Sequence, residues 1–595
     1  MSLPDDWFRY PDLKSRKFAK AVWIPLRAIE DIRSERDFGE LGYLKETFAC
    51  GSLAIPLEHR ELGEKLGWSE IGVGHSIGHY CGPEGYKRAD EYWLDWPSPG
   101  VAGAELVLPQ SYGWEVPAEW HLNHDLVLAL RLRREGDVWI APDEGYVEVI
   151  RLKRDSEGHP VRVEIRAEHL RDYLAARKMA LRIVWHRDRD AIVKDATRFG
   201  IGRTETQESR GFRWVGMCYP VHEGSGDPIG SQSAVFHVWR TDVDPNEDVP
   251  EFGPETNDNV DYTSRTFSRG GNEVFRVEGE IWAEEWIEPG EHSPRVRGDK
   301  LASSTRFIVD ASGATQSADE LNDEDIGKYL WFRAEVIPDL LSRRGVEWRW
   351  HSRETGSIEI TPGYHVQFGV NRLGLINAYA YDVAKLPEWQ RRIWQGFNIA
   401  PDGGVSAELL SAQMRAEPAE TLAPEAYIWQ ATSDVDEEFA ARFGRRLFRS
   451  HPSRSEISST IHRFRALDQQ GVYALAKDVS RLIVEAIDTS ALHKLAPPEQ
   501  GGGTGSMRSL ERVLRMIAAP EKAREVLTHL VGIYELRGAD AHLPSSDLND
   551  AYRLAGVDKS AAPLEQGLQI LLRTMQVLGR LYQLLATAPE APPKT

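Results

Sequence analysis

The pattern of apolar and polar residues in the first part of the chain changes between strand and helix periods. Tyr146–Leu152 places apolar residues at alternate positions, and Val161–Ile165 follows as a partner after the turn Glu157–Pro160. Such pairs are typical of antiparallel strands. Ala167–Met179 instead has apolar residues three and four positions apart, as one face of a helix requires. We therefore expect a mixed α/β domain over residues 1–190, a candidate sensor.

The next region combines strand-like segments with acidic loops. Val274–Trp282, His365–Val370 and Leu375–Tyr381 are rich in β-branched and aromatic residues. Thr241–Asp261, which precedes them, is acidic and rich in Pro, Asn and Gly, a composition typical of a surface loop or linker. The sequence thus predicts a β-rich, tryptophan-containing domain over residues 191–431, a candidate sensor or scaffold.

The apolar period becomes helical after about residue 432. The last segment, Leu564–Ala586, has apolar residues at steps of three and four, and Pro563 stands where a first-turn proline belongs. Gly501–Gly505 predicts a flexible loop. Five further segments have helical patterns: 437–449, 455–467, 472–487, 507–517 and 519–536. We expect a multidomain chain, with a mixed α/β and β-rich N-terminal portion and an all-α helical bundle over residues 432–595.

Composition and charge narrow the class of protein. A chain of 595 residues is too long for one core. The 19 tryptophans all precede residue 431, where they either fill cores and β surfaces or form a ligand platform. The three cysteines, Cys50, Cys81 and Cys218, cannot all pair, which favours a reducing compartment. The N-terminus has no secretory pattern and no apolar run predicts a membrane span, so we expect a cytoplasmic protein.

The net charge of −20 argues against general coating of nucleic acid. The charge is uneven, because residues 441–595 hold 21 Lys and Arg against 16 Asp and Glu, a net of +5. The first 440 residues therefore carry −25. An acidic N-terminal part and a mildly basic C-terminal part are consistent with a regulatory region joined to a module that binds a polyanion. Alternatively, the charges only solvate the surface.

An arginine and a histidine with four residues between them are a candidate pair for metal-free phosphate chemistry. The chain contains four such pairs: Arg154/His159, Arg446/His451, Arg524/His529 and Arg537/His542. The first falls in a predicted turn, and the second ends a helix within a basic cluster. The third lies inside one helix, where five residues leave the two side chains about 140° apart. Of the four pairs, Arg537/His542 has the sequence context that best suits a reaction centre.

Arg537 continues an apolar stripe formed by Val526, Leu530 and Ile533. A charged side chain at such a position requires a partner. Gly538 follows directly and permits the helix to stop or turn sharply. The sequence therefore predicts that the helix ends here, with the arginine at its last turn.

Two roles for Arg537 follow from this position. Pro544 prevents simple continuation of the helix, so His542 is able to fold back beside the arginine. In the alternative, Arg537 caps the helix in an ion pair with Asp540 or Asp547, and His542 is an ordinary surface residue.

The segment Leu536–His542, within a C-terminal helical bundle, resembles the R-x4-6-H motif of the HEPN superfamily. The likeness covers about the last 150 residues. Members are typically metal-independent endoribonucleases that dimerise, so that two motifs form one cleft, and many act in anti-phage defence. The resemblance implies that Arg537 and His542 are catalytic. The motif often has a polar residue directly after the arginine, where this chain has Gly538, and Asp540 is the candidate for that group.

The implied chemistry requires no cofactor and no divalent metal. RNA supplies its own nucleophile, the 2′-hydroxyl. His542 transfers a proton as general base or acid, and Arg537 stabilises the charge of the transition state. The products are a 2′,3′-cyclic phosphate and a 5′-hydroxyl. The expected partners are RNA, a second copy of the chain, and a phage-derived trigger or regulatory partner.

A second cluster, His75, His79 and Cys81, has H-x3-H-x-C spacing and is a weak candidate for a metal site. The many glycines of this stretch make an ordinary loop the stronger interpretation.

Three hypotheses for the function of the chain therefore remain. The first is an endoribonuclease effector of abortive infection, or a toxin-like protein, with N-terminal sensing regions. The second is a non-catalytic helical dimerisation module on a sensing scaffold, and the third is an enzyme with a metal site in the N-terminal domain.

Overall fold

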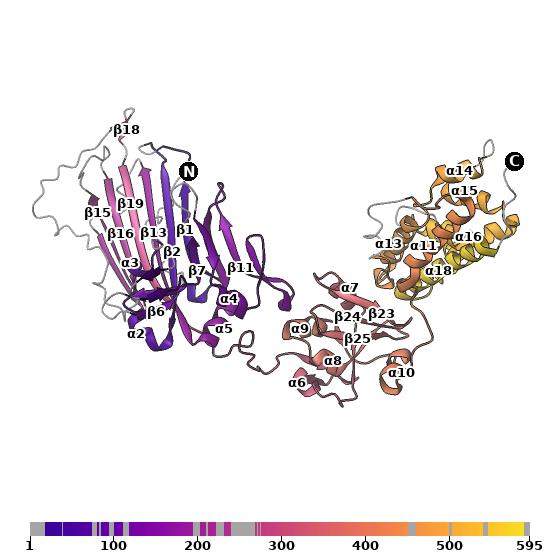
Figure 1. The fold of residues 1–595 in the computed structure, drawn as a ribbon, viewed down its shortest axis with the longest axis horizontal. Coiled ribbons are helices and arrows are strands. Elements are labelled where there is room, and N and C mark those ends of the chain that lie inside the picture. Colours follow the sequence, from indigo (N-terminus) through magenta and orange to yellow (C-terminus); the bar gives the residue numbers. More distant parts are fainter. Residues whose placement is uncertain are drawn as a thin grey trace, which may run out of the picture. The chain divides into compact units, whose positions relative to one another are not determined.

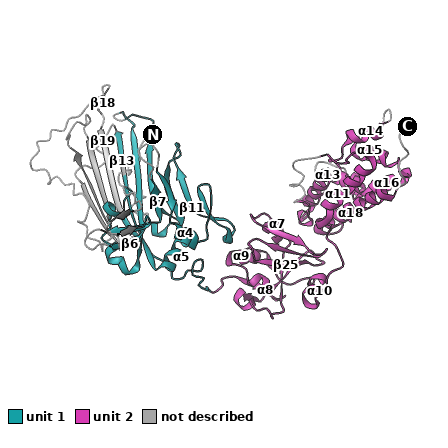
Figure 2. Cartoon of the chain, viewed as in Figure 1, with its two compact units in different colours: residues 1–301 teal, residues 302–595 magenta. Residues whose placement is uncertain are grey.

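The computed structural model groups the chain into two compact units, Met1–Leu301 and Ala302–Thr595 (Figure 2). Each unit has its own hydrophobic core. The division into three domains at residues 190 and 431 stays a prediction. The described residues are 18–37, 40–73, 80–82, 85–94, 100–110, 118–193, 203–209, 212–221, 231–239, 268–269, 272–273, 275–449, 460–498, 503–538 and 545–587.

Unit 1 is built on a 13-stranded sheet (Figure 1). Its main path runs β14 (Arg203–Ser209), β15 (Phe212–Val221), β16 (Ser231–Trp239), β19 (Phe275–Ile287), β13 (Met179–Val193), β2 (Leu44–Pro56), β1 (Trp23–Arg33), β12 (Pro160–Arg166), β11 (Val147–Arg154), β10 (Val138–Ala141), β9 (Arg133–Glu135). The pairing is antiparallel except between β16 and β19. Strands β5 (Glu91–Leu94) and β6 (Gly100–Ala104) pair beside β2. The sheet therefore continues well past residue 190.

Shorter elements complete unit 1. They are the hairpins β3 (Tyr80–Gly82) with β4 (Gly85–Lys87), β7 (Val107–Gln110) with β8 (Glu119–Leu122) and β17 (Ser268–Arg269) with β18 (Asn272–Glu273), and the helices α2 (Arg60–Gly63), α3 (Trp68–Ile71), α4 (His124–Ala129) and α5 (Ala167–Arg177). Helix α5 packs into the main core with Leu170, Tyr173 and Leu174 buried, as its apolar spacing predicts. It stops where Lys178 takes a left-handed φ of 55°.

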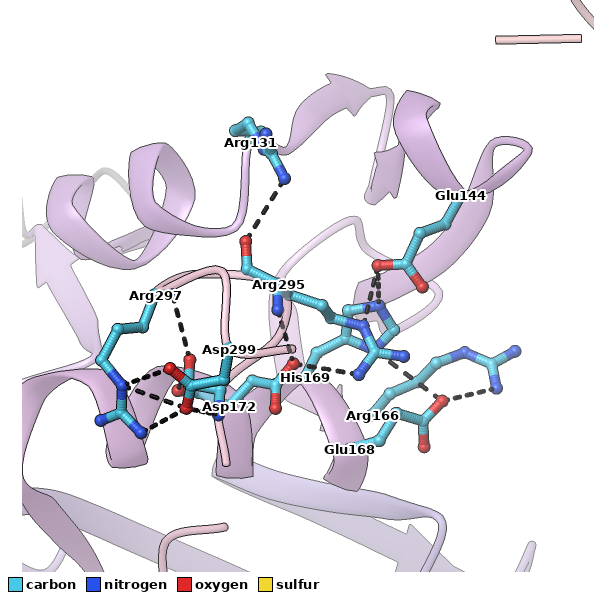
Figure 3. Close-up of polar contacts among 10 residues, drawn as sticks. Arg131, Glu144, Arg166, Glu168, His169, Asp172, Arg295, Arg297 and Asp299 are labelled. Atoms are coloured by element: carbon cyan, nitrogen blue, oxygen red, sulfur yellow. Dashed lines mark hydrogen bonds and ion pairs between the residues drawn. The ribbon is translucent and has the colours of Figure 1, made fainter. Parts of the chain in front are cut away.

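Residues 288–301, named here the strap, fold back onto α5 (Figure 3). Arg295 holds the strap, because its guanidinium bonds Glu144 at 2.8 Å and Asp172 at 3.0 Å. The Ser293 hydroxyl donates to the Asp172 carbonyl at 2.8 Å. The ring of buried His169 lies 3.2 Å from Glu144, so one carboxylate joins the helix and the strap.

The first part of unit 2 is a six-stranded antiparallel sheet in the order β23-β24-β25-β26-β22-β27 (Figure 1). The strands are β23 (Glu347–Trp350), β24 (Thr355–Glu359), β25 (His365–Val370), β26 (Ile376–Tyr379), β22 (Tyr329–Phe332) and β27 (Asn398–Ile399). A small hairpin and five helices accompany it: β20 (Arg306–Ile308) with β21 (Thr315–Ser317), α6 (Ala318–Leu321), α7 (Val336–Leu341), α8 (Ala380–Ala384), α9 (Glu388–Phe397) and α10 (Ala407–Arg415). The predicted strand at 365–370 is confirmed by β25. The one predicted at 375–381 is confirmed over residues 376–379 by β26, and its end is wrong because helix α8 begins at Ala380.

The second part of unit 2 is helical, as the sequence predicts. Its helices in the described ranges are α11 (Pro424–Phe443), α13 (Gln469–Leu482), α14 (Thr489–Leu495), α15 (Ser506–Leu514), α16 (Pro520–Leu536), α17 (Ser545–Ala555) and α18 (Pro563–Thr587). The predicted helix at 437–449 is wrong at both ends: α11 begins earlier and stops where Gly444 takes a left-handed φ of 68°. Within the described part of 455–467, Thr460 is helical and Arg463–Arg465 forms a 3₁₀ turn.

The sheet and helical parts of unit 2 share side chains at the joint Ile461–Ala466. Phe464 belongs to the core of the sheet part and stacks on Trp350 at a centroid distance of 5.8 Å. Arg463 and Glu425 form a buried ion pair at 2.7 Å. A β-rich N-terminal portion and a helical C-terminal portion are therefore confirmed. No helix in the described ranges is long and apolar enough to cross a bilayer.

Candidate functional site at the end of helix α16

Helix α16 ends as its sequence predicts. Val526, Leu530 and Ile533 are buried in the core of the bundle. The helix ends at Leu536, and the backbone N–H of Gly538 bonds the Glu535 carbonyl at 3.0 Å. Arg537 is the residue that follows the last helical position. Its backbone is therefore fixed, while its side chain lies at the edge of the apolar stripe.

Two neighbours hold the Arg537 side chain. Nη1 forms an ion pair with Glu485, which lies beyond the end of α13. Nη2 donates to the Tyr534 hydroxyl at 2.5 Å, and the guanidinium carbon lies 3.7 Å from the centroid of the Tyr534 ring. This is a hydrogen bond combined with a cation–π contact. The arginine is thus oriented by Glu485 and Tyr534. Among the described residues, no hydrogen bond or ion pair joins it to Asp547.

The guanidinium keeps donors for a further ligand. The Arg537 side chain is 32% exposed. Within the described ranges its Nε has no hydrogen-bond partner, and each Nη has a second N–H. His542 and Asp540 lie outside the described residues, as do His75 and His79 and the side chain of Cys81. The predicted pairing of Arg537 with His542 therefore stays a prediction.

A pocket of about 530 Å³ opens beside Tyr534. It lies between α15 and α16, with single contributions from Val484 and from Leu554 of α17. Two arginines, two carboxylates, three hydroxyls, glycine backbone and an apolar floor line it: Arg508, Arg524, Glu511, Glu535, Ser506, Thr528, Tyr534, Gly503, Gly505, Val484, Met507, Leu527, Val531 and Leu554. Tyr534 lines the pocket and also contacts the Arg537 guanidinium, so the pocket lies next to Arg537.

The charges of the pocket are only partly matched. Glu511 pairs with Arg515 at 2.5 Å and more loosely with Arg524 at 3.8 Å. The side chain of Arg508 is exposed and has no ion-pair partner among the described residues. Partial burial and the charges of Asp550 and Asp547 raise the pKa of Glu535. The pocket therefore presents cationic donors beside two carboxyl groups, of which Glu511 is already paired and Glu535 has a raised pKa.

The other Arg/His pairs make structural contacts. Arg154 bridges Glu119 at 2.6 Å and Asp137 at 3.0 Å in unit 1. Arg446 pairs with Asp436 at 2.9 Å, and His451 lies outside the described residues.

The third pair, Arg524 and His529, separates on its helix. The His529 ring bonds the Leu554 carbonyl at 3.0 Å, whereas Arg524 lines the pocket. This separation agrees with the angle of about 140° expected for five residues of a helix. Across the described ranges, no group of three or more His, Cys, Asp or Glu side chains is arranged to hold a metal ion.

Sequence reasoning missed Glu485, Tyr534 and Arg508. Glu485 lies in an apolar segment 52 positions before Arg537, and no local pattern connects the two. The glycine-rich stretch before α15 was a usable signal for the pocket, because Gly503 and Gly505 line it. At Gly503 a Cβ would lie 2.5 Å from Cδ and Nη1 of Arg508, so the glycine makes room for the arginine.

Comparison with known proteins gives no relative. No protein-family model, no curated protein and no solved structure matches the chain.

Proposed function

We propose that the protein is a metal-independent endoribonuclease whose reaction centre contains Arg537 and His542, with Asp540 as a further polar group. The observation that carries the proposal is the state of the Arg537 guanidinium. Glu485 and Tyr534 orient it, some of its N–H donors have no partner among the described residues, and a pocket with two further arginines adjoins it. A preoriented guanidinium loses little freedom when it binds a phosphate, which suits transition-state stabilisation. The setting in a C-terminal helical bundle supports the HEPN likeness.

The proposed reaction is an internal transfer of the phosphoryl group. A base removes the proton of the RNA 2′-hydroxyl, and the oxygen attacks the adjacent phosphorus. The bond from phosphorus to the 5′-oxygen breaks, and that oxygen receives a proton. His542 is the proposed proton-transfer group. Arg537 donates N–H bonds to the phosphate oxygens as negative charge builds up on them.

The biological role we propose is anti-phage defence by abortive infection, or a toxin-like role, in which unit 1 senses a trigger. An effector that cuts cellular RNA harms its host, so its activity requires control. The uneven charge, acidic before residue 441 and basic after it, supports a division between a regulatory portion and an RNA-directed portion.

A second candidate function is a non-catalytic helical module for dimerisation or partner binding. The ion pair between Arg537 and Glu485 favours it, because the guanidinium already has a carboxylate partner. In that case Arg537 stabilises the end of α16 and takes no part in chemistry.

Purified protein incubated with total RNA in EDTA tests the proposal. Wild type should cut RNA to products with 2′,3′-cyclic phosphates, and Arg537→Ala and His542→Ala should each lose at least about a hundredfold in rate. Arg537→Lys should recover only part of the loss, because lysine keeps the charge without the planar fork. Thermal unfolding of each variant checks the fold.

Arg553→Ala is the matched control. Arg553 lies on α17 in an exposed ion pair with Asp550 and does not line the pocket. Its substitution should leave the cleavage rate unchanged. Full activity in either Arg537→Ala or His542→Ala would overturn the assignment of the site, and absence of cleavage by the wild type would favour the non-catalytic module.

A further inference from the structure

The pocket beside Tyr534 has the size and chemistry of a ligand site. Its volume of about 530 Å³ falls within the range of about 300 to 1,000 Å³ typical of small-molecule pockets. We propose that it binds one phosphorylated nucleotide, namely a nucleotide unit of the RNA strand next to the cleaved phosphate. In placing that unit within a substrate strand, the assignment rests on the proposed endoribonuclease function.

The two arginines of the pocket bind the phosphate. Arg508 is exposed, and within the described ranges no carboxylate neutralises it. Arg524 has a side chain 77% exposed, and its contact with Glu511 is loose at 3.8 Å. Glu511 has a closer partner in Arg515. The guanidinium groups of both arginines are therefore available to bind a phosphate in the pocket, because no close ion pair within the described ranges engages them.

The rest of the lining suits a base and a sugar. Val484, Leu527, Val531 and Leu554 supply an apolar floor against which a flat base packs. Thr528 and Ser506 supply hydroxyls, and Glu535 supplies a carboxyl group with a raised pKa. These groups accept or donate hydrogen bonds to ribose hydroxyls and base edges. A ligand with one anionic end and one flat apolar end matches this division better than a free inorganic anion does.

Tyr534 joins the pocket to the proposed reaction centre. Its ring and hydroxyl hold Arg537, and the same residue lines the pocket. A nucleotide in the pocket therefore lies one side chain away from Arg537. This places the neighbouring phosphate of a strand within reach of the guanidinium, and it makes the pocket a positioning site for the substrate rather than part of the proton transfer.

Calorimetric titration of the full-length protein tests the assignment with three probes. They are adenosine 5′-monophosphate, adenosine without phosphate, and an octamer of deoxyadenosine, which cannot be cut because it has no 2′-hydroxyl. The monophosphate and the octamer should bind, and adenosine should bind more weakly. Arg508→Ala and Arg524→Ala should each weaken binding of the monophosphate and the octamer about tenfold or more. Arg553→Ala, outside the pocket, should bind as wild type does.

The outcomes separate the pocket from the catalytic proposal. If neither the monophosphate nor the octamer binds, or if both arginine variants bind normally, the pocket assignment is overturned, whatever RNA cleavage shows. Monophosphate binding that the octamer does not displace overturns the placement in a strand and assigns the pocket to a free nucleotide. Pocket binding with no RNA cleavage by wild type overturns the catalytic proposal alone. Thermal unfolding confirms that both variants remain folded.

Discussion

At the scale of single residues, burial decides how the joint in unit 2 responds to pH. His462 is 9% exposed, its ring lies 5.2 Å from that of Trp348, and its Nδ1 has no hydrogen-bond partner in the part of the chain that the structure describes. Burial lowers its pKa from 6.5 to about 4, with Glu425 opposing and Arg465 adding to the shift. The folded state therefore keeps this histidine neutral under conditions that protonate it in the unfolded chain.

We predict that His462 makes unit 2 less stable in mild acid. Above pH 6.5 both states hold the neutral ring, and its contribution is complete. As the pH falls from 6.5 towards 4, only the unfolded state binds the proton, so the free energy of unfolding decreases. The two pKa values set an upper limit of about 3 kcal/mol on this loss.

Urea unfolding of wild type and His462→Phe at pH 7, 6, 5 and 4.5 measures the effect. The phenylalanine keeps an aromatic ring between Trp348 and Phe464 but cannot bind a proton. Its stability should fall less than that of wild type over this range. His351→Phe, at an exposed position on the same sheet part, controls for loss of a histidine at the surface. Parallel pH curves for wild type and His462→Phe would contradict the prediction.

At the scale of elements, the sequence predicted those features that depend on residues close together in the chain. The stripe of α16 and the position of Arg537 at its end follow from spacing along one helix. The strand β25 likewise spans the predicted residues 365–370. The partner of Arg537 was not predictable in this way, because Glu485 reaches it only through the packing of the bundle. The start of α11 was also missed. Its first turn is held by the buried ion pair of Glu425 with Arg463, a residue far along the chain that no local pattern connects to it.

The strap of unit 1 is a second element that long-range contacts hold in place. We predict that Arg295→Ala releases it, because the variant leaves the mostly buried Asp172 without its guanidinium partner. Burial raises the pKa of Asp172, and Arg295 counteracts that shift. Loss of the arginine should lower the stability of unit 1 by about 1–3 kcal/mol. Backbone hydrogen exchange over the strap, residues 288–301, followed by mass spectrometry, should accelerate.

Arg131→Ala is the control for the strap. Arg131 has a side chain 67% exposed and touches the strap through one bond to the Arg295 carbonyl at 3.3 Å (Figure 3). Its removal should leave exchange in the strap nearly unchanged. Equal exchange in Arg295→Ala and wild type would show that the bonds of Ser293 and Arg297 to α5 are sufficient to hold the segment.

At the scale of the whole molecule, the proposed chemistry implies an assembly. One Arg537 and one His542 per chain make a small reaction centre, and the HEPN likeness implies that two copies of the motif share a cleft. We therefore predict that the active species is a homodimer with a composite site. Sedimentation of the wild type should give twice the chain mass of 67.2 kDa.

Mixing two inactive variants tests the composite site directly. Arg537→Ala and His542→Ala dimers, co-incubated under conditions of subunit exchange, form mixed dimers that hold one intact arginine and one intact histidine in the shared cleft. Cleavage should then reappear at up to about half of the wild-type rate, because about half of the dimers are mixed. A site contained within one chain would give no recovery. Recovery that depends on protein concentration, and is absent when the two variants are separated by a membrane, would assign the reaction to the dimer.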